Sequence, residues 1–166
     1  DLNVPLHTTK NYNGQLTGQE GIHGFWESRI PELLAKNYSF WVGKAEYIEK
    51  PQLAIWEAVA ISHSMVDSVL SIEKELTAHF PKDQKYSYEE RNGLTVRVYS
   101  WDFTTAYALA LDHQVERQMR KSIKMIADFW YTAWINAGQP ELHSLDQVII
   151  EEEKLTPDSR LKVRDH

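Results

Sequence analysis

Hydrophobic residues recur at helical spacing in two long stretches of the chain. In the first, between residues 52 and 80, apolar positions are three or four residues apart, which predicts a helix. Pro51 stands where a helix favours its first residue, and Pro81 ends the pattern. His63 falls on the apolar stripe, which favours a core histidine hydrogen-bonded to Asp67 or the backbone over a functional one. The expected core-facing positions are Trp56, Val59, His63, Val66 and Leu70.

The second stretch predicts the longest helix of the protein. It starts near Thr104 or Thr105, either of which is a suitable N-cap, and stops at Gly138, with Pro140 just beyond. At 1.5 Å per residue such a helix is roughly 45–50 Å long, so it needs partners along its length. The helix over 52–80 is the expected partner. The apolar stripe that would face it consists of Val115, Met119, Ile123, Ile126, Trp130, Ala133 and Ala137.

The N-terminal third of the chain is less regular. Residues 1–21 contain an Asn-Gly turn signal and further glycines, which indicate a loop. A helix is expected from Ile22 to about Asn37, where Pro31 should produce a kink or two short helices. Residues 37–50 are rich in Trp, Tyr and Gly and predict a connection.

One strand-like patch interrupts this helical pattern. Apolar and polar residues alternate over 94–99, and residues 91–93 before it predict a turn. One short strand does not form a sheet, so we expect an all-α fold, a helical bundle. Residues 1–142 would form part of a single helical domain. Residues 143–166, which include the acidic run 151–153, would form a peripheral helix or tail.

Composition narrows the possible classes of protein. The chain has 166 residues, 42% hydrophobic and 25% charged, which is typical of one foldable domain. Its 18 Lys and Arg against 24 Asp and Glu give a net charge of −6, which argues against a basic nucleic-acid-binding surface. No run of about 18 apolar residues is present, so we expect no transmembrane segment. Cysteine is absent, so any metal must be held by His, Asp and Glu.

A set of such residues lies near the start of the chain. His23 and Glu27 are four residues apart on the expected helix, so they share one face. Imidazole nitrogen and carboxylate oxygen are zinc ligands, but two ligands do not complete a site. His7, which follows the rigid Pro5, supplies a third, and Asp1 would supply a fourth. Spacing alone leaves open the alternative that His23 and Glu27 are a helix-surface pair.

The order of these residues, Asp-x5-His-x15-His-x3-Glu, in the wording DLNVPLH … GIHGFWE, resembles a known family. It is similar to the zinc-dependent phospholipase C and single-strand-specific nuclease superfamily, most of all to the bacterial phospholipase-C-like branch. The match is specific over residues 1–34 and looser over 52–142. The resemblance implies an all-α bundle with three zinc ions at the bottom of a cleft. The ligands of one zinc would be His7, His23 and Glu27.

The same resemblance makes Asp1 the counterpart of a carboxylate that bridges the other two zinc ions. The family's remaining ligands lie upstream of this position, so the chain resembles the C-terminal half of such an enzyme and would itself supply one zinc. The implied activity is hydrolysis of a phosphodiester, such as a phospholipid head group or a nucleotide, by an exported protein. The polar loop over 8–19 should border the cleft, with Tyr12 and Asn13 as candidate substrate-binding residues.

Two classes of function therefore remain open. In the first, the full-length protein is a zinc phosphodiesterase, and this chain, inactive alone, provides one zinc site and part of the cleft. In the second, the chain is a non-catalytic helical binding or scaffold domain that keeps the fold without an active metal cluster. In either case, apolar helix faces that belong against a missing N-terminal half would be exposed and would favour self-association.

Overall fold

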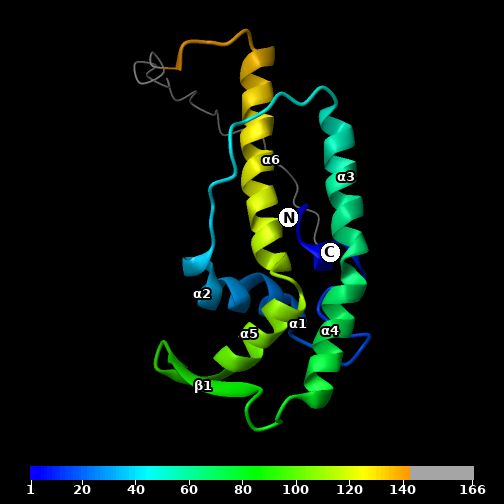
Figure 1. Cartoon of the computed structure of the whole chain (residues 1–166), viewed down its shortest axis with the longest axis vertical. Helices are drawn as coiled ribbons and strands as arrows, with labels where there is room; N and C mark the ends of the chain where they lie inside the picture. The colour runs from blue at the N-terminus through cyan, green and yellow to red at the C-terminus, as the bar shows by residue number, and fades with distance from the viewer. Residues whose placement is uncertain (143–166) are drawn as a thin grey trace, which may run out of the picture.

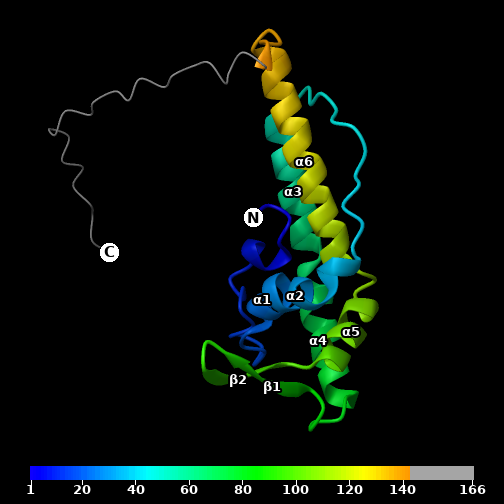
Figure 2. The same ribbon diagram turned by 90° about the vertical axis from the view of Figure 1, so that its left-hand side faces the viewer.

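The computed structural model describes residues 1–142, so the predicted tail at 143–166, with its acidic run, lies outside the described part (Figure 1). Two helical columns run along the molecule. The longer helices are α3 (Pro51–Ser64), α4 (Val66–His79), α5 (Trp101–Ala110) and α6 (Gln114–Asn136). In the view of Figure 1, α3 and α4 form the right-hand column, and α6 forms the upper part of the left-hand one. Figure 2 shows α5, the short helices of residues 22–37 and a β-hairpin gathered at the lower end.

The hydrophobic core lies in this lower half. The ring of Phe25 stacks on that of Tyr99, with centroids 3.8 Å apart, and on that of Tyr107, at 5.0 Å. The Tyr107 hydroxyl donates a hydrogen bond of 2.7 Å to the backbone carbonyl of Val69 on α4. The buried residues of this cluster are Leu6, Ile22, Phe25, Trp26, Ile30, Val69, Phe103, Tyr107, Ala108, Leu111 and Val115. The core therefore includes apolar neighbours of His7, His23 and Glu27.

The helix expected from Ile22 to Asn37 is present and is interrupted, as predicted. α1 (Ile22–Gly24) leads into a π-helical segment, Phe25–Arg29, then α2 (Ile30–Leu34) and a 3-10 turn, Ala35–Asn37. In the π segment the N–H of Ile30 bonds to the carbonyl of Phe25, one residue further back than in an α-helix. Pro31 has no backbone N–H, so the helix lacks one hydrogen bond at this position. The wider π turn lies directly before it.

The prediction of an all-α fold is wrong, because residues 86–99 form an antiparallel hairpin in a structure that is 58% helical. β1 (Tyr86–Arg91) pairs with β2 (Leu94–Tyr99), and the strand-like pattern predicted over 94–99 is β2. The turn between them holds Asn92 at φ 53° and Gly93 at φ 76°. Positive φ at both central residues matches the right-handed twist of the two strands. The prediction failed because β1, with the sequence YSYEER, has no aliphatic residue to mark it.

The single long helix predicted from Thr104 to Gly138 is also wrong, because the chain turns between α5 and α6. Asp112 and His113 adopt left-handed conformations, and the N–H of His113 bonds to the carbonyl of Ala108 at 2.9 Å, which closes the end of α5. The N-cap of α5 is Ser100, whose side chain accepts from the N–H of Phe103, rather than Thr104 or Thr105. The predicted stop at Gly138 is confirmed.

The helical column over 51–79 begins at Pro51 and ends before Pro81, as predicted, but it breaks between α3 and α4 at Met65. By length and composition alone, Pro51–His79 is apolar enough to cross a membrane. Its most apolar 18 residues have a mean hydropathy of 1.3, and 22% of them are buried. A mostly buried core helix passes the same test, whereas here a small part, which includes Val69 of α4, lies in the core. The expectation of no transmembrane segment therefore stays a prediction.

The expected packing of the two long apolar stripes is not observed. Trp56 on α3 is 68% exposed and Trp130 on α6 is 76% exposed. An open groove of about 340 Å³ lies between these helices, lined by apolar side chains that include Leu2, Ile55, Met125, Ile126, Phe129 and Trp130. The upper halves of both helices therefore carry exposed apolar surface, and self-association through it stays a prediction.

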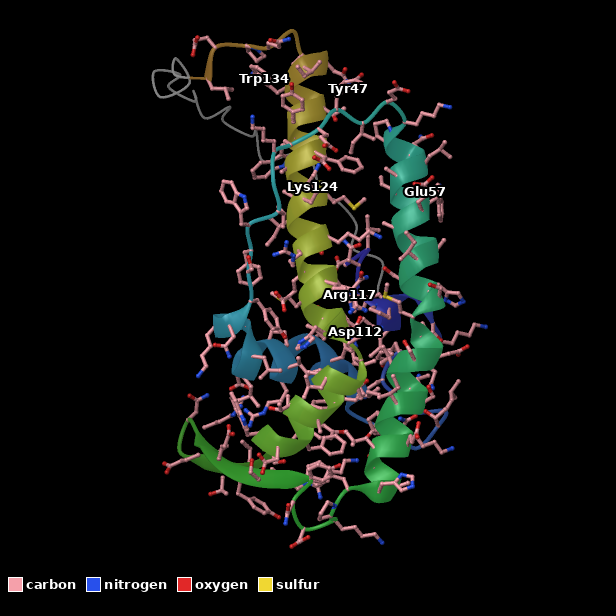
Figure 3. The ribbon with its side chains drawn as sticks, viewed as in Figure 1. Tyr47, Glu57, Asp112, Arg117, Lys124 and Trp134 are labelled. Carbon is pink, nitrogen blue, oxygen red and sulfur yellow. The ribbon has the colours of Figure 1, made fainter. Side chains whose placement is uncertain are left out.

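The connection predicted at 37–50 is confirmed and runs as an extended strap along α6. Side chains of α6 accept its backbone N–H groups: Asp128 from Glu46 at 2.7 Å, and Thr132 from Ile48 at 2.9 Å. Lys124 lies near the middle of α6, where its ammonium group donates to Asp128 at 2.6 Å (Figure 3). The strap therefore gains its backbone partners from helix side chains rather than from a sheet.

Candidate metal centre

The first candidate ligand, His7, lies in a 3-10 turn, Pro5–Thr8, that is tied to both helical columns. Leu6 within this turn is fully buried. Just before it, the carbonyl of Leu2 accepts from Ser62 of α3 at 2.7 Å. The adjacent Asn3 carbonyl accepts from Gln118 of α6 at 2.8 Å. These contacts fix the backbone that leads into His7.

The other two ligands come from the interrupted helix. Ile22 and Trp26 on this helix are buried, and the indole N–H of Trp26 donates to Gln114 of α6 at 3.1 Å. His23 and Glu27, each the next residue in sequence, have side chains that are 24% and 41% exposed. Burial of the apolar pair therefore holds the helix so that the polar pair stays accessible to solvent.

The three side chains converge on one point. Nε2 of His7 lies 3.0 Å from Nε2 of His23, and Nε2 of His23 lies 2.7 Å from Oε2 of Glu27. Nε2 of His7 is 3.4 Å from the same carboxylate oxygen. Among the described residues, the three form a group whose ligand atoms could hold a metal ion. The structure thus brings together the three residues that the sequence had placed at one zinc.

The triangle of ligand atoms is close in size to the one that zinc requires. Tetrahedral coordination with bonds of about 2.1 Å places neighbouring ligand atoms roughly 3.4 Å apart. One edge, at 3.4 Å, equals this value, and the other two, at 3.0 and 2.7 Å, are shorter, so the ligand atoms would move slightly apart around an ion. Because the two imidazoles meet the carboxylate through Nε2, each ring keeps Nδ1 available to carry its proton and donate outward. The donor set of two nitrogens and one oxygen is among those that bind catalytic zinc.

Asp1 does not join this triangle. Its Oδ1 lies 3.7 Å from Nδ1 of His7, the ring nitrogen that does not face the cluster, and its side chain is 95% exposed. At this distance it is a charged neighbour of the imidazole rather than a hydrogen-bond partner. A role for Asp1 as a ligand of other metal ions stays a prediction from the resemblance.

The two predicted substrate-binding residues lie in the loop between the ligands but differ in availability. Tyr12 is 53% exposed, and its ring stands edge-on to that of His23, with centroids 6.0 Å apart. The side-chain oxygen of Asn13 accepts from the N–H of Gly21 at 3.1 Å. Tyr12 is therefore placed to meet a molecule beside the cluster, whereas Asn13 already holds the loop that leads into α1.

The prediction that His63 is a core histidine is wrong. It is exposed, and its Nδ1 lies 3.1 Å from the hydroxyl oxygen of Thr8, beside His7. The Thr8 hydroxyl gives its own proton to the carbonyl of Pro5 at 2.7 Å, so Nδ1 of His63 is the donor in this contact. The failure has the same cause as the exposure of Trp56, because no helix within residues 1–142 covers that face of α3.

An ion-pair network, which sequence reasoning missed, joins the π segment to the hairpin. Arg29 is 7% exposed and donates to the carbonyl of Tyr99 at 3.0 Å and to the carboxylates of Glu32 and Glu89. Arg91 bonds to both carboxylates as well. Hydrogen bonds from Arg91 and then Arg29 lower the pKa of Glu32 from its usual 4.5, and those from Arg29 and then Arg91 lower the pKa of Glu89. The two arginines therefore favour the ionised form of both carboxyl groups in the folded protein.

Comparisons with known proteins do not identify a relative. No family model matches the chain, and neither a curated protein nor a solved structure matches it. The activity therefore has to be proposed from the residues, above all from the group of His7, His23 and Glu27, whose ligand atoms could hold a metal ion.

Proposed function

We propose that His7, His23 and Glu27 hold one zinc ion and that the protein containing this chain hydrolyses phosphodiesters. The observation that carries the proposal is the convergence of three ligand atoms within 3.4 Å of one another. They come from two segments separated by 15 residues and fixed by different contacts. A chance surface pair at His23 and Glu27 would not account for the third ligand, the imidazole of His7.

The openness of the cluster favours a catalytic over a structural site. Structural zinc sites are closed by four protein ligands, whereas catalytic sites keep a position for water or substrate. Here three ligands meet and all are partly exposed. When bound, zinc supplies Lewis-acid activation of a phosphoryl group and of water.

The chain's own residues contribute binding and orientation around that ion. Imidazole binds a metal as a neutral ligand and carboxylate as an anion, so a divalent ion held by His7, His23 and Glu27 would keep a net positive charge. Such a site attracts an anionic group despite the net charge of −6 on the chain. The exposed ring of Tyr12 limits the space beside His23 and would orient what binds there.

The choice of phosphodiester as substrate rests on the resemblance over residues 1–34, which also implies export and up to three zinc ions in the full-length protein. The competing function is a helical binding or scaffold domain without an active cluster. The exposed apolar surface of α3 and α6 is compatible with both. Metal content and turnover separate the two.

The test measures zinc stoichiometry on this chain and hydrolysis of bis-(p-nitrophenyl) phosphate by the full-length protein, with and without chelator. We expect one zinc per chain, its loss in His23→Ala, and chelator-sensitive turnover. His79→Ala is the matched control, because His79 is an exposed histidine at the end of α4, where Nδ1 contacts the carbonyl of Glu75. Unchanged zinc content in His23→Ala would show that the ligands are assigned wrongly, and zinc without turnover would favour the scaffold function.

A further inference from the structure

Gln19 lies four residues before His23, and its backbone is fixed on both sides. Its N–H donates to the carbonyl of Gly14 at 2.9 Å, and its own carbonyl accepts from the N–H of Ile22 at 3.1 Å. A Cβ added to Gly14 would lie 2.3 Å from the carbonyl oxygen of Gln19, so these two backbones are in direct contact. Ile22, whose N–H bonds to Gln19, is the first residue of α1, and His23 follows it. A shift of Gln19 would therefore also shift His23.

The side chain of Gln19 connects this loop to α4. Its amide nitrogen donates to the carbonyl of Leu70 at 2.9 Å and to Oε2 of Glu73. Both hydrogens of the amide group are therefore used by one helix. Leu70 and Glu73 are 51 and 54 residues away in sequence, so this contact joins the loop to a distant part of the fold.

Glu73 is a firm anchor for this contact. It is 3% exposed, and its Oε1 accepts from Thr77 at 2.8 Å and from the ammonium of Lys85 at 2.9 Å. The Lys85 nitrogen also lies over the ring of Phe103, 5.0 Å from its centroid. A buried carboxylate with an ionic partner and further hydrogen-bond donors is held in one position, because moving it would break these bonds without replacing them by bonds to water.

We propose that Gln19 is a positioning residue for the candidate metal centre. By joining the loop to Glu73, it holds His23 in place beside His7. His7 is fixed separately, through the contacts of residues 2 and 3 with Ser62 and Gln118. Gln19 thus adds an attachment to α4 to the contacts of Ile22 and Trp26 that already hold the helix of His23. The inference rests on the proposed zinc site.

The test is Gln19→Met, which keeps the length of the side chain and removes both donors. We expect zinc affinity to fall about 10-fold or more, the size of effect seen when groups that orient ligands are removed. The control is Gln52→Ala, since Gln52 is an exposed glutamine at the start of α3. Thermal unfolding in the absence of zinc shows whether the variant is folded, and Gln19→Asn, which is too short to reach Glu73, provides a second variant.

A double-mutant cycle separates positioning from a general loss of stability. His23→Ala is expected to lose its stoichiometric zinc, so the cycle is measured at higher zinc concentrations. If Gln19 acts through His23, then Gln19→Met should change the weak affinity that remains in His23→Ala by less than about twofold. Equal loss of affinity in the two backgrounds would overturn the inference, as would wild-type affinity in both Gln19 variants. Absence of zinc binding by the wild-type chain would overturn the metal centre itself, and the inference with it.

Discussion

Replacing Glu27 with glutamine tests the metal centre with the smallest change of shape. The carboxylate is the one anionic ligand of the cluster, and its Oε2 lies 2.7 Å from Nε2 of His23 and 3.4 Å from Nε2 of His7. The substitution keeps the size of the side chain and removes its charge. Since Glu27 is 41% exposed, the free energy of unfolding without zinc should change by no more than about 0.5 kcal/mol.

With zinc the difference should be large. A ligand present at 100 times its dissociation constant stabilises the folded state by about 2.7 kcal/mol, which in a chain of this size raises Tm by roughly 5–10 °C. Loss of a direct ligand should weaken binding by about 100-fold or more, because groups that merely orient ligands are worth 10- to 100-fold. At the same zinc concentration, Glu27→Gln would then gain about 0.4 kcal/mol, or roughly 1 °C.

The assay is thermal unfolding of wild type and variant, followed by circular dichroism, across a zinc titration. Glu20→Gln is the matched control, because Glu20 is an exposed glutamate in the loop before the same helix. It should keep the full zinc-dependent rise. An equal zinc-dependent rise in Tm in Glu27→Gln and wild type would refute the assignment of Glu27 as a ligand. Loss of that rise in both Glu27→Gln and Glu20→Gln would show that zinc binding depends on surface charge in general.

Two further predictions concern the hairpin. The pKa values of Glu32 and Glu89 are lowered from 4.5 in the folded protein, so their ion pairs should stabilise it fully above pH 4.5. This stabilisation should be lost as the pH falls through the lower pKa values of the folded state. The Tm should therefore fall more steeply below pH 4.5 in wild type than in the Glu32→Gln/Glu89→Gln double variant. Gly93→Ala should lower stability in thermal melts by about 1–2 kcal/mol, since Gly93 has φ 76°, and an unchanged Tm would contradict the observed turn.

Local signals predicted several element ends correctly. Pro51, Pro81 and Gly138 each act through their own backbone chemistry, which does not depend on the rest of the fold. Pro31 likewise interrupts its helix within one turn. The hairpin was missed although Asn92 and Gly93 carry a strong turn signal, because its first strand, rich in tyrosine and glutamate, is recognised only through its pairing.

The break between α5 and α6 could not be read from periodicity. The apolar stripe continues through Val115 in phase with α5, and the turn uses Asp112 and His113 at positive φ instead of glycine. Burial of Leu111 and Val115 on either side of the turn compensates for this strain, and that compensation depends on the tertiary core. A sequence pattern records which residues are apolar but not where the chain reverses between them.

The same division between local and distant signals applies to the candidate site. His23 and Glu27 were found because one helical turn brings them together, and His7 because the order of residues matched a known pattern. The groups that hold them, Gln19 with Glu73 and residues 2 and 3 with Ser62 and Gln118, are separated by more than 50 residues. No spacing rule relates such pairs, since a hydrogen bond across the fold leaves no period in the sequence. The ligands of a metal site are therefore easier to predict than the contacts that set the distances between them, and substitutions at Gln19 address those contacts directly.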